Sequence, residues 1–132
     1  MIEVRRSDHA GRGGRGVFAR VDISAQTLIE RVPVLLMPTN QVFGDAPDAQ
    51  RHARLSWYVF DWEGVTKRSY VALALGYGSI YNHSYEPNAI YKKVAPDILE
   101  FHAIKNIAAD EEITINYHGD PNDMRPMYFD MK

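Results

Sequence analysis

The chain has 132 residues and a mass of 15.1 kDa, the size of a single domain with one core. It contains no cysteine, which excludes a disulfide framework, a thiolate zinc site and a cysteine nucleophile. A formal net charge of −2 argues against a protein that binds nucleic-acid phosphates. No apolar run approaches the roughly 20 residues of a membrane span, and the first residues lack the apolar centre of a secretory signal. We expect one domain over residues 1–132, without a membrane or a direct nucleic-acid partner.

The apolar residues mostly alternate with polar ones or form short runs rich in Val, Ile, Tyr and Phe. Such residues suit a pleated, half-buried surface, and short runs at regular spacing predict a mainly β fold. A parallel sheet with crossover helices is not expected, because strands do not alternate with long helical patterns. The expected strands are Val17–Val21, Leu28–Met37, Tyr58–Trp62, Tyr70–Leu75, Ala89–Val94, Ile98–Ile104 and Ile113–Tyr117.

Turn residues between these runs predict two hairpins. Tyr58–Trp62 is expected to pair with Tyr70–Leu75, and Ala89–Val94 with Ile98–Ile104. The best helix candidate is Asp48–Ser56, which is short and only weakly amphipathic. The sequence therefore predicts small sheets joined by turns, with little helix.

Four glycines cluster near the start of the chain, at Gly11, Gly13, Gly14 and Gly16. They fit the dinucleotide-binding pattern GxGxxG, but that pattern needs a strand before it and a helix beginning on it. An alternating, β-branched run follows here instead, so a Rossmann site is rejected. The cluster predicts a loop whose backbone can approach a ligand closely, and the simpler alternative is a flexible turn.

The C-terminal end is acidic, with six acidic residues against two basic ones from position 110 onward. Such an end suits a cationic partner such as a basic peptide, while a solvated, soluble surface is the simpler explanation. Glu111 and Glu112 are interpreted as part of a solvated turn.

Three blocks carry the most information: GRGVFA at 14–19, NHSYEPN at 82–88 and DEEITINY at 110–117. In sequence and in order they resemble the three blocks of the SET-domain protein lysine methyltransferases. The resemblance runs from about Arg5 to Tyr117, with residues 118–132 as a short tail. The aromatic stretch from residue 57 to 62 also resembles small viral and bacterial members of that family, which lack cysteine-rich flanking segments.

The resemblance implies a SET-domain (β-clip type) fold of short curled sheets. It also implies a C-terminal pseudoknot, in which the chain near NHS would pass under a loop of the C-terminal segment. S-adenosylmethionine would bind on one face, and the substrate lysine would enter from the other through a narrow channel. The implied function is an S-adenosylmethionine-dependent protein-lysine N-methyltransferase acting on an exposed lysine of a histone or another basic protein, with S-adenosylhomocysteine as the second product.

The resemblance also assigns roles to residues. Asn82 would bind the amino group of the cofactor, and His83 would meet the adenine mainly through its backbone. Tyr117 matches the tyrosine at the methyl-transfer site, and Tyr58 is the second expected catalytic residue. The implied substrate channel consists of Tyr58, Ile115 and Tyr117. The implied cofactor-binding residues are Gly14, Arg15, Gly16, Val17, Asn82, His83, Tyr117 and Tyr128.

The chemistry of methyl transfer agrees with such a site. An in-line displacement depends mainly on positioning, and tyrosine hydroxyls can orient a neutral amine. Lysine has a reference pKa near 10.4, which desolvation beside a positive sulfonium would lower. An aliphatic Ile115 leaves more room than the aromatic residue common in the family, so di- or trimethylation is expected. No metal is expected, because neither the spacing of His83, His102 and His118 nor nearby carboxylates support a ligand set.

The chain departs from the family pattern in ways that leave alternatives open. Because cysteine-rich segments are lacking, either Tyr128 or Phe129 of the tail covers the adenine or a homodimer completes the site. Asp110 stands where the family commonly has glycine, a change that a type I turn tolerates. The alternative function is a catalytically silent SET-like module that binds S-adenosylmethionine or a basic peptide. A bacterial or viral source, and hence a cytoplasmic location with host chromatin as a further destination, is the default expectation.

Overall fold

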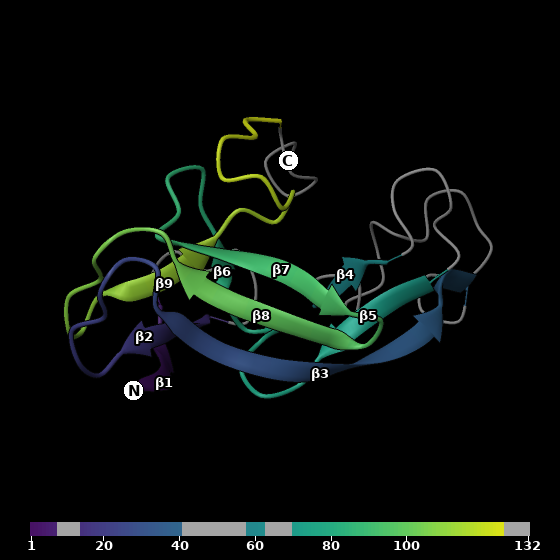
Figure 1. Ribbon diagram of the computed structural model, residues 1–132, viewed down its shortest axis with the longest axis horizontal. Helices are drawn as coiled ribbons and strands as arrows, with labels where there is room; N and C mark the ends of the chain where they lie inside the picture. Colours follow the sequence, from purple (N-terminus) through teal and green to yellow (C-terminus); the bar gives the residue numbers. More distant parts are fainter. Residues whose placement is uncertain (8–13, 41–57, 63–69, 126–132) are drawn as a thin grey trace.

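The computed structural model describes residues 1–7, 14–40, 58–62 and 70–125, whose strands form two sheets (Figure 1). One sheet has the strand order β1-β2-β9-β6, and the other has the order β4-β5-β3-β8-β7. Within these ranges no helix has the length and apolar character of a membrane span. The strands are β1 (Ile2–Arg6), β2 (Arg15–Ala19), β3 (Leu28–Pro38), β4 (Val59–Asp61), β5 (Tyr70–Ala74), β6 (Asn82–His83), β7 (Ala89–Ala95), β8 (Ile98–Ala103) and β9 (Glu112–Ile115).

The four-stranded sheet joins the beginning of the chain to its C-terminal part. β1 pairs antiparallel with β2, and β2 pairs antiparallel with β9. β6 then pairs with β9 in parallel, the one parallel pairing among the described strands. This pairing places the NHSYEPN block beside the strand that leads to Tyr117, as the expected pseudoknot requires.

The five-stranded sheet is built on β3, an 11-residue strand that curves along the lower edge of Figure 1. β8 pairs with its first part and β5 with its second part, and both pairings are antiparallel. The register with β8 shifts between Leu28 and Glu30. Because such an irregularity increases local twist, it contributes to the curl of this sheet.

Side chains from both sheets fill one core. Buried and partly exposed residues alternate along β8, so Leu99 and Phe101 are fully buried. In the smaller sheet Val17 lies opposite Ile113, and both are fully buried in the same cluster. Burying one side chain of this size stabilises a fold by about 1.5–3 kcal/mol. The shared core therefore holds the sheet that carries β6 firmly against the long strands.

The mainly β prediction is confirmed, since seven of the nine strands in the described ranges fall on predicted runs and both hairpins form. β2 runs from Arg15 to Ala19, so it begins and ends two residues earlier than predicted. The predicted helix over Asp48–Ser56 lies outside the described residues.

Two strands were not predicted. β1 contains consecutive charged residues, Arg5 and Arg6, which weaken the apolar pattern that marks a strand. β6 has only two residues, and its sequence alone suggests a turn. The pairing with a distant strand creates β6, so a local pattern could not reveal it.

The turn before β9 differs from the type I turn that the sequence suggested. The N–H of Glu111 donates to the carbonyl of Ala108 at 3.1 Å, and Asp110 between them has a φ of 72°. A type I turn has negative φ at both central residues, so that expectation is wrong. Glycine adopts the left-handed conformation easily, which explains why the resembled family commonly has glycine at this position. Aspartate is among the other residues that tolerate this conformation.

Candidate active site

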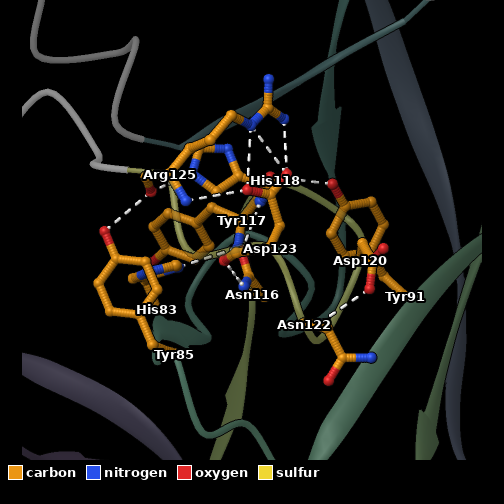
Figure 2. Close-up of polar contacts among 10 residues, drawn as sticks. All are labelled: His83, Tyr85, Tyr91, Asn116, Tyr117, His118, Asp120, Asn122, Asp123 and Arg125. Carbon is orange, nitrogen blue, oxygen red and sulfur yellow. Dashed lines mark hydrogen bonds and ion pairs between the residues drawn. The ribbon is translucent and has the colours of Figure 1, made fainter.

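The pairing of β6 with β9 brings the NHSYEPN block and Tyr117 into one site. His83 lies opposite Ile115 in the parallel register, two residues before Tyr117. The rings of His83 and Tyr117 are therefore adjacent, with centroids 5.1 Å apart (Figure 2). Two predicted site residues that are far apart in the sequence thus lie together.

Three hydrogen bonds fix the position of Tyr117. Its hydroxyl donates to the carbonyl of Tyr81 at 2.6 Å, and its N–H donates to Nδ1 of His83 at 3.0 Å. Its carbonyl accepts a bond from the hydroxyl of Tyr91 at 3.0 Å. Because Nδ1 of His83 accepts, the neutral imidazole carries its hydrogen on Nε2. The phenol of Tyr117 is therefore held in one orientation by three separate elements of the fold.

Asn82 connects the NHSYEPN block to the glycine loop and to β9. Its side chain is buried, with 3% of its surface exposed. The amide nitrogen donates to the carbonyl of Arg15 at 2.8 Å and to the Glu112 carboxylate at 2.7 Å. Three separate segments of the chain thus meet at this one amide.

At two of the predicted cofactor-binding positions the structure requires glycine, for a different reason at each. Gly14 has a φ of 68°, in the left-handed region that favours glycine. At Gly16 an added Cβ would lie 2.8 Å from the amide nitrogen of Asn82 and would clash with the Glu112 carboxylate. The loop backbone therefore runs against Asn82 at a distance that only glycine allows.

The segment after β9 folds back beside the 82–88 block (Figure 2). The Tyr85 hydroxyl and Nε2 of His118 both donate to the carbonyl of Arg125, at 3.0 and 2.7 Å. The Arg125 guanidinium is 2.7 Å from the carboxylate of Asp123, and hydrogen bonds from Arg125 lower the pKa of Asp123 to about 2. This C-terminal segment lies where the expected pseudoknot places it.

The other predicted site residues have different environments. Val17 and Ile115 are fully buried in the core cluster. Tyr58 lies just before β4 and is partly buried. Tyr128 lies outside the described residues. The catalytic and channel roles of Tyr58 and Ile115 and the cofactor contact of Tyr128 stay predictions.

Glu111 and Glu112 were interpreted as a solvated turn: Glu111 is exposed and closes the turn before β9, whereas Glu112 is partly buried in β9, so the interpretation is wrong for Glu112. The Glu112 carboxylate, partly buried, accepts bonds from Asn82 and from the Ser7 hydroxyl, the latter at 2.6 Å. The Glu111 carboxylate accepts a bond from the side chain of Asn88 at 3.2 Å. Motif reasoning missed Ser7 and Glu112 because 105 positions separate them and their contact depends on the folded sheet.

A second polar pair, also missed, supports the carbonyl that Tyr117 contacts. Tyr81 is 1% exposed, and its hydroxyl donates to the Glu30 carboxylate at 2.8 Å. Burial raises the pKa of Glu30, and burial with the neighbouring carboxylate raises the pKa of Tyr81 well above its usual value. The Tyr81 ring stacks on Phe101 with centroids 4.5 Å apart. Both contacts fix the backbone carbonyl of Tyr81.

Glu30 gives stability a specific pH dependence. Because its folded pKa is raised, the folded state binds this proton more tightly than the unfolded chain, and stability falls as pH rises from about 4.5 through the folded pKa. We expect Glu30→Gln to remove this loss, since glutamine keeps an acceptor for Tyr81 without ionising. Urea unfolding of both proteins from pH 4.5 to neutral should show the free-energy difference moving in favour of the variant as pH rises. A constant difference would contradict this assignment.

The arrangement provides oriented hydrogen-bonding groups in place of a charged nucleophile. The Tyr117 hydroxyl and the Tyr81 carbonyl are two oxygen atoms 2.6 Å apart, just before the start of β6. Among the described residues, no three His, Asp or Glu side chains are grouped to hold a metal ion. The side chains present can bind a ligand's polar groups and hold a reacting atom in place, which suits a group transfer that depends on positioning.

Comparisons with known proteins show the family to which the chain belongs. The sequence model of the SET domain family matches residues 14–118. A histone-lysine N-methyltransferase of Schizosaccharomyces pombe, specific for H3 lysine 37, is 32% identical over 120 residues, which cover 88% of this chain and 72% of that protein. The crystal structure of a candidate histone methyltransferase of Plasmodium falciparum has a TM-score of 0.64 and 31% identity, covering 91% of this chain and 99% of that chain. A ctPRC2 structure bound to S-adenosylmethionine, at 21% identity and a TM-score of 0.64, covers 88% of this chain and 15% of that chain and shows the fold alone.

The chain belongs to the SET domain family. The family match, the relative over most of the chain and the shared fold confirm the SET-type fold. Within that family the protein is a protein-lysine N-methyltransferase.

Proposed function

We propose that this protein transfers methyl groups from S-adenosylmethionine to a lysine side chain in a histone or a similar basic protein. The observation that supports this most is the junction of β6 with β9, which brings Asn82 and Tyr117 into one site. The glycine loop meets the same junction through the carbonyl of Arg15. Sequence blocks 14–19, 82–88 and 110–117 are thus parts of one site.

The residues at this junction fit the proposed cofactor. The amide nitrogen of Asn82 donates both of its hydrogens to groups of this chain. The amide oxygen faces the other way and can accept a hydrogen bond from an ammonium group. Gly16 keeps the loop backbone close and without a side chain beside that amide. The backbone of residues 14–17 and the side chain of Asn82 would hold the amino-acid part, and His83 would lie toward the adenine.

When bound, S-adenosylmethionine supplies an activated methyl group on a positive sulfonium. The chain's own residues orient the acceptor and exclude water from it. The Tyr117 hydroxyl, fixed against the carbonyl of Tyr81, would present an oxygen that aligns the neutral amine of the substrate. Partial burial of this tyrosine lowers the local polarity, which favours the deprotonated form of an entering lysine.

The proposed substrate class rests on charge and on the relative. Exposed carboxylates at Glu111 and Asp120 lie before and after β9 and suit a cationic peptide. The Schizosaccharomyces pombe relative is named for lysine 37 of histone H3. We therefore infer a lysine within a basic segment. A cytoplasmic location, a bacterial or viral source and a homodimer that completes the site remain proposals.

Incubation with labelled S-adenosylmethionine and a panel of core histones and other basic proteins tests this function. We expect label in at least one basic protein, with mass spectrometry locating it on a lysine and showing di- or trimethyl product. Replacing that lysine by arginine should abolish labelling. A folded protein that binds S-adenosylmethionine but labels no protein would favour the catalytically silent alternative, and monomethyl product alone would contradict the role inferred for Ile115.

A further inference from the structure

We propose that Glu112 is a positioning residue for the cofactor site: its carboxylate orients the Asn82 amide so that the amide oxygen receives the ammonium group of S-adenosylmethionine. This inference rests on the proposed function. It assigns a role to the Glu112 carboxylate, which the sequence analysis placed in a solvated turn. It also gives a reason for the contact between Asn82 of β6 and Glu112 of β9.

The two contacts of the Asn82 nitrogen determine which way its amide faces. One partner is the backbone carbonyl of Arg15 at 2.8 Å, and the other is the Glu112 carboxylate at 2.7 Å. Both partners can only accept a hydrogen bond, so the nitrogen of the amide must face them. A flipped amide would set its oxygen against two acceptors. The amide oxygen of Asn82 is thereby directed away from both, and it makes no hydrogen bond within the described residues.

The Glu112 carboxylate is itself held in place from several sides. Its other oxygen accepts from the hydroxyl of Ser7 at 2.6 Å, and Ser7 is buried. The backbone of Glu112 pairs with Phe18 in β2, and its carbonyl accepts from the side chain of Asn88 at 2.8 Å. A Cβ at Gly16 would occupy the space that the carboxylate fills. A carboxylate fixed on both oxygens can hold the amide in one orientation.

Charge supports the same assignment. A carboxylate hydrogen-bonded to Asn82 makes the surroundings of the amide favourable for a cation, and a charge-assisted bond holds the amide more strongly than a neutral one. The ligand group that Asn82 would meet is an ammonium. The chemistry of the two side chains together therefore selects a positively charged group at this point.

Calorimetric titration of two ligands into three variants tests the proposal. S-adenosylmethionine carries the ammonium group, whereas 5′-methylthioadenosine has the same nucleoside and sulfur without the amino-acid part. For Glu112→Ala we expect at least about tenfold weaker binding of S-adenosylmethionine, and for Glu112→Gln about threefold, because glutamine keeps an acceptor without the charge. Binding of 5′-methylthioadenosine should change less than about twofold in both, because it does not reach Asn82. Glu111→Gln is the matched control: it removes the charge of the neighbouring carboxylate, which contacts Asn88 and not Asn82, so both affinities should be unchanged.

The results distinguish the role of Glu112 from the function of the site as a whole. Equal losses for both ligands would show that Glu112 only supports the fold, and would overturn the proposal. Unchanged binding of S-adenosylmethionine by Glu112→Ala would overturn it while leaving the proposed function intact. A folded wild-type protein that binds no S-adenosylmethionine would overturn the proposed function together with this inference.

Discussion

Replacing Tyr117 by phenylalanine is expected to slow methyl transfer at least about 100-fold while S-adenosylmethionine affinity changes less than about threefold. The change removes one oxygen atom and leaves the ring against His83. A 100-fold loss corresponds to about 2.7 kcal/mol of transition-state stabilisation. Losses of that size are typical when a preorganised hydrogen-bonding group is removed from the reacting centre.

The physical reason lies in how the phenol is held. Its hydroxyl is tied to the Tyr81 carbonyl at 2.6 Å, while its backbone is bonded to His83 and Tyr91. Phenylalanine keeps those backbone bonds, so the segment should stay in place. The lost oxygen is the one proposed to align the substrate amine, whereas the proposed ammonium contact at Asn82 is untouched.

Tyr85→Phe is the matched control for this prediction. It also removes a hydroxyl that donates to a backbone carbonyl, but that carbonyl belongs to Arg125 of the C-terminal segment, at 3.0 Å, and Tyr85 itself is partly buried. Single-turnover rates with saturating cofactor should fall for Tyr117→Phe and change less than about threefold for Tyr85→Phe. Similar rates for wild type and Tyr117→Phe would exclude a catalytic role for this hydroxyl.

Local sequence patterns predicted most of the fold because most strands follow a simple rule. The burial of β8 alternates residue by residue, and its apolar positions Leu99 and Phe101 are visible in the sequence. β6 follows no such rule, because it consists of two polar residues that become a strand only by pairing with β9. The positive φ of Asp110 was also hidden, since aspartate fits several turn types.

In the candidate site, too, contiguous sequence blocks could be predicted, whereas contacts between residues far apart in the sequence could not. The blocks around Gly16, Asn82 and Tyr117 are short and contiguous, so they could be found by their resemblance to a family. The groups that fix those residues are distant in sequence: Glu112 contacts Ser7 across 105 positions, and Tyr81 contacts Glu30 across 51. Glu112 and Tyr81 lie in or beside these blocks, but the sequence does not reveal their partners, because these contacts form only once the sheets have formed.

Replacing Asn82 by alanine is expected to weaken S-adenosylmethionine binding by at least about 30-fold, because hydrogen bonds to charged groups contribute about 1.5–3 kcal/mol. The change removes the acceptor proposed for the ammonium group. It also leaves the Arg15 carbonyl and the Glu112 carboxylate without a donor that the native structure supplies. The variant should therefore be less stable as well, and its folding must be checked by circular dichroism and thermal unfolding.

Asn88→Ala separates the two effects. Asn88 is a buried asparagine of the same sequence block, and its amide bonds the carbonyl of Glu112 at 2.8 Å and the N–H of Thr114 at 2.9 Å. Alanine there should cost about 1–3 kcal/mol of stability, because buried backbone groups lose their partners, yet no proposed cofactor contact is removed. If calorimetry shows equal loss of binding in the two variants, the affinity reflects the integrity of the fold alone. If only Asn82→Ala loses binding, the amide at the β6–β9 junction contacts the cofactor directly, since both variants disturb the same strand.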